Sequence, residues 1–119
     1  FMGLIGATRE FSEGGRARLA LEARADLGNV IGGVHGGCVL TLLDVVMASA
    51  AVSALDFQRT AVTLSMDSSF LAPGRGRLVA DGEVLQQDGH IAHCRAWVTD
   101  AQGAMVARAL GTFRYLPLP

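Results

Sequence analysis

The sequence predicts an α+β domain in which an antiparallel sheet curls around one long helix. One observation is an apolar run over residues 38–55 that has the length of a helix and contains no proline or glycine. The other is a series of strand-like stretches separated by turn signals, which gives a sheet with one apolar face. The central run is the one helix apolar enough to cover that face. A chain of 119 residues is long enough for one core, so residues 1–119 form a single domain.

The elements are expected in a simple order along the chain. Residues 1–15 are ambiguous between a short helix and a loop that ends in a Gly14-Gly15 turn, and residues 16–25 alternate like a half-buried strand. A loop over 26–34 leads into the helix. Four further strands are predicted over 61–71, 77–86, 90–99 and 104–115. Asp81-Gly82 suggests a bulge and Asp88-Gly89 a two-residue hairpin, so we expect these four strands to be consecutive antiparallel neighbours.

The predicted helix carries one carboxylate, Asp44, near its middle. A helix that is apolar all round must be covered on all sides by protein or by lipid. Lipid is the weaker choice, because the run is short and Asp44 would cost roughly 2.5 to 3.5 kcal/mol in a membrane. Carboxylates are seldom buried unless something pairs with them or uses them. Asp44 is therefore either a core aspartate bonded to a backbone or hydroxyl group, or a site residue.

Two glycines, Gly36 and Gly37, precede the helix. They let a ligand approach their backbone N–H groups, and the first turn of a helix has unpaired donors and the positive end of the dipole. Such a place can hold a carbonyl oxygen that gains charge, although glycines before a helix are often just a turn. Cys38 also lies at the helix start, where thiol pKa values can fall, but we expect it to serve packing.

Spacing separates these two candidate groups. Asp44 is eight residues beyond Gly36, which at 1.5 Å rise per residue is about 12 Å along the axis. Both groups cannot touch one reacting carbon in the same subunit, because near-attack distances are about 3 to 3.5 Å. If they cooperate, a second copy of the helix must supply the carboxylate across a two-fold axis. The sequence therefore predicts a composite site at a dimer interface.

Composition excludes several other classes. The net charge is −1 and no basic stripe is present, which argues against nucleic-acid binding. Two cysteines make neither a disulfide framework nor a metal cluster, so no metal is expected and the cytoplasm is the expected location. The first residues lack the basic and apolar regions of a signal peptide.

A linked pattern around the helix consists of Asn29, Gly32, His35-Gly36-Gly37, Asp44, Val62-Thr63 and Phe70-Leu71-Ala72-Pro73. This pattern resembles the hotdog-fold acyl-CoA thioesterases. It looks like the subgroup that contains the phenylacetate-pathway thioesterases and one class of 4-hydroxybenzoyl-CoA thioesterase. The resemblance runs from about residue 16 to residue 115 and implies a curved antiparallel sheet wrapped round one long helix. It also implies active sites between two subunits of a homodimer, and pairing of dimers into a homotetramer stays open.

The resemblance also implies roles for single residues. Gly36 would polarise the thioester carbonyl with its N–H, while Asn29 and His35 would shape that pocket. Asp44 of the facing subunit would be the base or the nucleophile, and Thr63 would help to hold water. For His35 we prefer a ring that fixes the loop by hydrogen bonding over a general base. Thioester hydrolysis needs an oxyanion donor and an activated water or a covalent carboxylate, with no cofactor beyond the coenzyme A of the substrate.

The substrate contacts are less specific. Gly37, Met47 and Ala48 are expected beside the acyl group, which is aryl or medium-chain. Arg75 and His90, with His93, Arg59 and Arg77, could meet the phosphates of coenzyme A, or could be solvated surface charges. Coenzyme A and an acyl carrier protein both remain open as the carrier. Two other functions remain open on the same fold, namely an acyl-thioester hydratase or dehydratase and a non-catalytic acyl-CoA binding protein.

Overall fold

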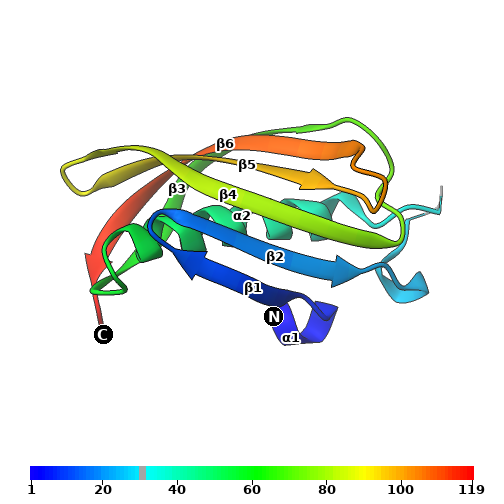
Figure 1. Cartoon of the computed structure of the whole chain (residues 1–119), viewed down its shortest axis with the longest axis horizontal. Coiled ribbons are helices and arrows are strands. Elements are labelled where there is room, and N and C mark those ends of the chain that lie inside the picture. Colours follow the sequence, from blue (N-terminus) through cyan, green and yellow to red (C-terminus); the bar gives the residue numbers. More distant parts are fainter. Residues whose placement is uncertain (30–31) are drawn as a thin grey trace.

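A computed structural model describes residues 1–29 and 32–119, in which a six-stranded antiparallel sheet curls around one long helix (Figure 1). The spatial order of the strands is β1-β2-β4-β5-β6-β3, so that β1 and β3 form the two edges. The predicted α+β class and central helix are confirmed. The elements are α1 (Met2–Ile5), β1 (Thr8–Glu13), β2 (Arg16–Glu22), a 3-10 turn (Ala25–Leu27), α2 (Gly36–Ala54), β3 (Arg59–Phe70), β4 (Arg77–Asp88), β5 (Ile91–Thr99) and β6 (Met105–Pro117).

The prediction that β3 lies beside β4 in the sheet is wrong. β3 pairs with β6, from Arg59 opposite Pro117 to Phe70 opposite Ala107, and does not lie beside β4. A direct hairpin requires a short turn, whereas residues 71–76 link β3 to β4 and contain a proline. This link is instead bound to the loop before α2, because the Gly74 carbonyl accepts a hydrogen bond of 2.8 Å from the Val34 N–H.

Strand β1 was not predicted, because its residues do not alternate in polarity. It is an edge strand with most residues exposed, and its register with β2 shifts between Arg9 and Phe11. Gly14 and Gly15 then make the expected turn. Both have positive φ, 59° and 87°, as a tight hairpin into β2 requires.

Gly82 does not mark a bulge, contrary to the prediction. The register between β4 and its neighbours is continuous there, and the shift lies between Val84 and Gln86. A Cβ on Gly82 would lie 2.8 Å from the Val46 carbonyl oxygen, so this glycine lets the helix approach the sheet. The predicted hairpin near Asp88 is confirmed one residue later, with Gly89 (φ 63°) and His90 in the turn.

Helix α2 is not covered on all sides by its own chain. Ten of its residues are buried against the sheet, among them Cys38 and Met47. We call the half-buried remainder that faces the gap between β1 and β3 the open face, consisting of Thr41, Asp44, Val45, Ala48 and Val52. By length and mean hydropathy (1.9) α2 could cross a membrane, but more than half of that stretch is buried in protein. A buried core helix passes the same test.

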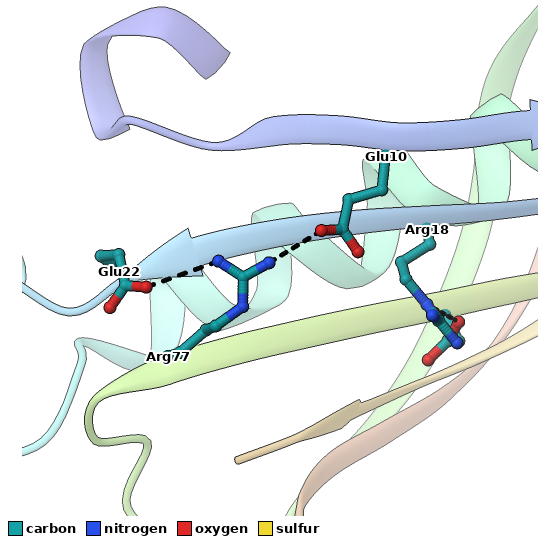
Figure 2. A network of polar contacts seen from close by, with 5 residues as sticks. Glu10, Arg18, Glu22 and Arg77 are labelled. Carbon is teal, nitrogen blue, oxygen red and sulfur yellow. Dashed lines mark hydrogen bonds and ion pairs between the residues drawn. The ribbon is translucent and has the colours of Figure 1, made fainter. Parts of the chain in front are cut away.

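The convex face of the sheet carries ion pairs that link neighbouring strands. Figure 2 shows Arg77 between Glu10 and Glu22, to which it is bound at 2.7 and 3.4 Å. Arg18 pairs with Asp81 at 2.7 Å. Exposed pairs of this kind stabilise a fold by about 0 to 1 kcal/mol each. Their consequence for function is that Arg77, expected as a possible phosphate contact, is paired with two carboxylates of its own chain.

Candidate active site

The loop before α2 is fixed by His35, the N-cap residue. Its Nδ1 accepts a hydrogen bond of 2.9 Å from the Gly37 N–H, so the neutral ring carries its proton on Nε2. The His35 N–H donates to the Leu27 carbonyl at 2.7 Å, and its own carbonyl accepts from Cys38 at 2.9 Å. These bonds are of the loop-fixing kind predicted for His35. They also occupy the N–H of Gly37.

Gly36 lies between His35 and Gly37, and its N–H stays available. Among the described residues this donor has no protein acceptor, and it lies at the positive end of a 19-residue helix. Gly36 borders a cavity of about 310 Å³ together with Asn29, Phe70 and Pro73. An oxygen atom of a ligand in this cavity could accept a hydrogen bond from the free Gly36 N–H.

Asn29 shapes the rim of the same cavity. Its Oδ1 accepts from the Gly33 N–H at 3.1 Å, and its own N–H donates to the Gly33 carbonyl at 2.8 Å. Gly33 in turn packs against the link between β3 and β4, because a Cβ there would lie 3.0 Å from the Pro73 Cβ. Val30 and Ile31 lie outside the described residues. Asn29 thus closes the loop that precedes the helix and holds it against residues 73–74.

Asp44 and Thr63 come together from two different elements. The Thr63 Oγ1 on β3 donates a hydrogen bond of 2.6 Å to the Asp44 Oδ1 on α2. Asp44 is therefore neither a core aspartate nor unpartnered; it is a half-buried carboxylate with a hydroxyl partner. A carboxylate offers about four acceptor positions, so one donor leaves it able to bind a water or a substrate.

A second cavity of about 470 Å³ surrounds this pair. Its floor is the open face of α2 and its sides are the two sheet edges. It shares no lining residue with the cavity at Gly36. Since α2 is continuous from Gly36 through Asp44, the two groups are about 12 Å apart along its axis. One chain therefore holds the two halves of the expected site apart.

The two helix residues expected beside the acyl group, Met47 and Ala48, lie on different sides of α2. Ala48 lies on the open face and lines the cavity of Asp44. Met47 does not line either cavity, contrary to the prediction. It is fully buried on the other side of α2, where its thioether would lie within 3.0 Å of a Cβ on Gly111. The helical period turns position 47 toward the sheet when position 48 faces the gap.

The expected basic patch does not form within one chain. Arg75 is in the link before β4, near the start of α2, and His90 is in the turn after β4, at the opposite end of the sheet (Figure 1). The length of β4 separates them by roughly 35 Å. The His90 Nδ1 lies 3.0 Å from Arg59 Nη1. One subunit cannot bring Arg75 and His90 to the same nucleotide.

Arg9 and Phe57 are among the residues lining the cavity of Asp44 that sequence reasoning missed. Arg9 lies on β1, the strand that the alternation did not reveal, so no signal pointed to it. Phe57 has a left-handed backbone (φ 61°), which is unusual for a bulky residue and follows another such residue, Asp56 (φ 51°). Strain of this kind is not visible in a sequence.

Comparison with known proteins places the chain in a family. The model of the thioesterase superfamily matches residues 31–107. The chain belongs to the thioesterase superfamily. A protein of Halobacterium salinarum, described as an inferred esterase, is 31% identical over 124 residues, which cover 95% of this chain and 82% of that protein. The sequence-based resemblance to this superfamily is confirmed.

Solved structures of other proteins share the fold of this chain. A conserved protein of Pseudomonas aeruginosa is 29% identical with a TM-score of 0.92, over 97% of this chain and 92% of the other. The PaaI protein from the phenylacetic acid degradation operon of E. coli is 24% identical with a TM-score of 0.88, over 97% and 83%. At that identity PaaI shows the shared fold. The curled sheet around one helix is therefore the hotdog fold that the sequence predicted.

Proposed function

We propose that the protein is an acyl-CoA thioesterase, which hydrolyses an aryl- or medium-chain acyl-CoA to the free acid and coenzyme A. The observation that carries the proposal is the pair formed by Asp44 and Thr63 in a cavity on the open face of α2. The free N–H of Gly36 supplies the second requirement, a donor for the carbonyl oxygen. Membership of the thioesterase superfamily supports the same reaction class.

In the proposed mechanism the Gly36 N–H donates to the thioester oxygen as negative charge develops on it. Asp44 of the facing subunit either attacks the carbonyl carbon or removes a proton from an attacking water. On either route a carbon–oxygen bond forms and the carbon–sulfur bond breaks, so that coenzyme A leaves as a thiolate and takes up a proton. Direct attack joins the acyl group to Asp44 as a mixed anhydride, which water then hydrolyses to the free acid and the regenerated carboxylate. Thr63 holds one carboxylate oxygen by its hydrogen bond, which orients Asp44 for either route.

The composite site requires two chains in contact near Asp44. Strand β3 is 12 residues long, forms one edge of the sheet and carries exposed apolar side chains at Val62 and Leu64. A long edge strand with such side chains is a template for pairing with another chain. In a two-fold dimer the start of one α2 can then approach the middle of the other. Pairing of dimers into tetramers extends this proposal.

The first test is thiol release from a panel of aryl-CoA and fatty acyl-CoA esters. We expect turnover of at least one ester by the native protein and loss of about 10²-fold or more with Asp44→Ala. Sizing of both proteins in solution checks that each is a folded dimer or tetramer. Hydration of an enoyl-CoA without thiol release would contradict the proposal, as would a monomer that is fully active.

A mixing experiment tests the composite site itself. Gly36→Pro removes the proposed donor, and proline is tolerated at the first position of a helix, especially after an extended residue such as His35 (ψ 137°). Each single variant should be inactive. A refolded equal mixture with Asp44→Ala should regain about a quarter of the native activity, because half of the dimers are mixed and each mixed dimer has one intact site. No recovery would place both groups in one subunit and overturn the composite site.

A further inference from the structure

The cavity that holds Asp44 also contains a cation, Arg9. Its Nη2 donates a hydrogen bond of 3.0 Å to the Ser49 Oγ, and Ser49 is only 7% exposed on α2. No acidic side chain among the described residues pairs with Arg9. By contrast, Arg18, Arg24, Arg77 and Arg95 each pair with an Asp or Glu. Arg9, an exposed residue, is thus held toward α2 by a neutral hydroxyl, and no carboxylate of the described residues pairs with its other donors.

The two charged groups lie at different levels of the same cavity. Asp44 and Ser49 are five residues apart, which corresponds to about 7.5 Å along the helix. The wall between them is apolar and comes from both α2 and β3. Its apolar residues are Val45 and Ala48 on α2 and Ala61 and Val62 on β3. The cavity therefore offers a carboxylate, an apolar passage and a guanidinium in that order.

We propose that Arg9 determines specificity by receiving a carboxylate at the far end of the acyl group. This inference rests on the proposed thioesterase function and names its substrate class as acyl-CoA esters of dicarboxylic acids. A dicarboxylic chain of roughly six carbons, counted from the thioester carbon beside Asp44 to the second carboxylate carbon, would place that carboxylate near Arg9. A guanidinium has five N–H donors in a planar fork, so the bond to Ser49 leaves donors for a bidentate carboxylate contact.

Arg9 could instead serve only to attach β1 to the helix. The neighbouring Ser12 does so without charge, since its Oγ donates to the Ser49 carbonyl at 3.0 Å. Loss of an attachment weakens the reaction of every ester, whereas loss of a specific contact weakens only the ester that uses it. The test must therefore measure a ratio of two substrates rather than one rate.

The decisive pair is adipyl-CoA and hexanoyl-CoA, which have six-carbon chains and differ in the terminal carboxylate. We expect the native protein to favour adipyl-CoA in kcat/KM. Arg9→Gln should lower the adipyl-to-hexanoyl ratio of kcat/KM roughly tenfold or more. The ratio for Arg9→Lys should lie between that of the native protein and that of Arg9→Gln. Two controls should keep the native ratio. Ser12→Ala removes the uncharged attachment, and Arg16→Gln removes one positive charge from an exposed position on β2.

Two results would overturn the inference while the thioesterase function stands. One is a native preference for hexanoyl-CoA, and the other is an equal loss of both activities in Arg9→Gln. If no ester releases thiol, the proposed function fails separately. Equilibrium binding of the same two esters to the native protein and to Arg9→Gln then decides the role of Arg9, since a contact to the carboxylate weakens only adipyl-CoA binding.

Discussion

The two faces of α2 look alike in the sequence and differ in the structure. On the face against the sheet, polar groups bond within the chain: the Ser53 hydroxyl donates to the Ala50 carbonyl at 2.8 Å, and the Tyr115 hydroxyl to the Ala51 carbonyl at 2.7 Å. On the open face, Asp44 has a partner on an exposed edge strand and a cavity beside it. The comparison teaches that one helix can hold the core together on one side and present chemistry on the other. Substitutions should therefore separate stability from activity according to the face they change.

The largest expected effect is on the open face. Asp44→Asn keeps the shape of the side chain and an oxygen for Thr63, but removes the charge that a base or nucleophile needs. We expect thioester hydrolysis to fall by about 10²-fold or more, with the urea midpoint unchanged or raised. A large loss of stability with proportionate loss of activity would show that Asp44 serves the fold.

Gly82→Ala should give the opposite result at the closed face, which is the side of α2 that packs against the sheet. Its Cβ would meet the backbone of Val46 at 2.8 Å, and a backbone cannot move aside as a side chain can. We expect a loss of ~1–3 kcal/mol in the free energy of unfolding, measured by urea denaturation. Gly111→Ala should also destabilise the fold, because its Cβ would meet the end of Met47 and the buried ring of Phe113 at 2.9 Å each, whereas the Cβ of Gly3→Ala meets nothing within 4 Å. Equal stability of all three variants would contradict the close packing of this face.

Thr63→Val should reduce activity more mildly. It removes the hydroxyl that donates to Asp44 at 2.6 Å and keeps the β-branched shape that suits a strand. We expect a roughly tenfold fall in kcat/KM, because one hydrogen bond to a charged group is lost. Thr63→Ser, which keeps the hydroxyl, should retain most of the activity. If the serine and valine variants behave alike, the hydroxyl has no role.

The buried cysteines between α2 and the sheet also predict a pH dependence of stability. Burial raises the pKa of the Cys94 thiol from 9.0 to about 12, and burial also raises the pKa of Cys38. Above pH 9 the unfolded chain loses the Cys94 proton while the folded chain keeps it, so the free energy of unfolding falls as pH rises toward 12. The slope is at most ~1.4 kcal/mol per pH unit, and full stability is present below pH 9.

Urea denaturation at pH 8 and pH 10 measures this fall. Cys94→Ala should show a smaller fall between the two pH values than the native protein, because it lacks the thiol that titrates in the unfolded chain. Identical falls in the two proteins would contradict the burial of a protonated thiol at position 94.

Sequence reasoning reached the helix, the hairpins and the separation of Gly36 from Asp44, because these depend on local pattern and on the rise of a helix. It missed β1, since an edge strand with both sides exposed has no alternation to reveal it. It misassigned β3, since the partner of a strand depends on the path of a link rather than on the strand's own residues. Met47 was misplaced for a similar reason. An apolar helix gives no sign of which side the sheet will cover.

Strand β3 has a consequence for how the protein could be controlled. In the proposed dimer it would both join the two chains and carry Thr63, the partner of Asp44. Dissociation would then remove the facing oxyanion donor from every site at once, without any change in the fold of a single chain. Specific activity would depend on protein concentration near the dissociation constant of the dimer, and a ligand that bridges two subunits would raise its own rate of turnover by holding them together.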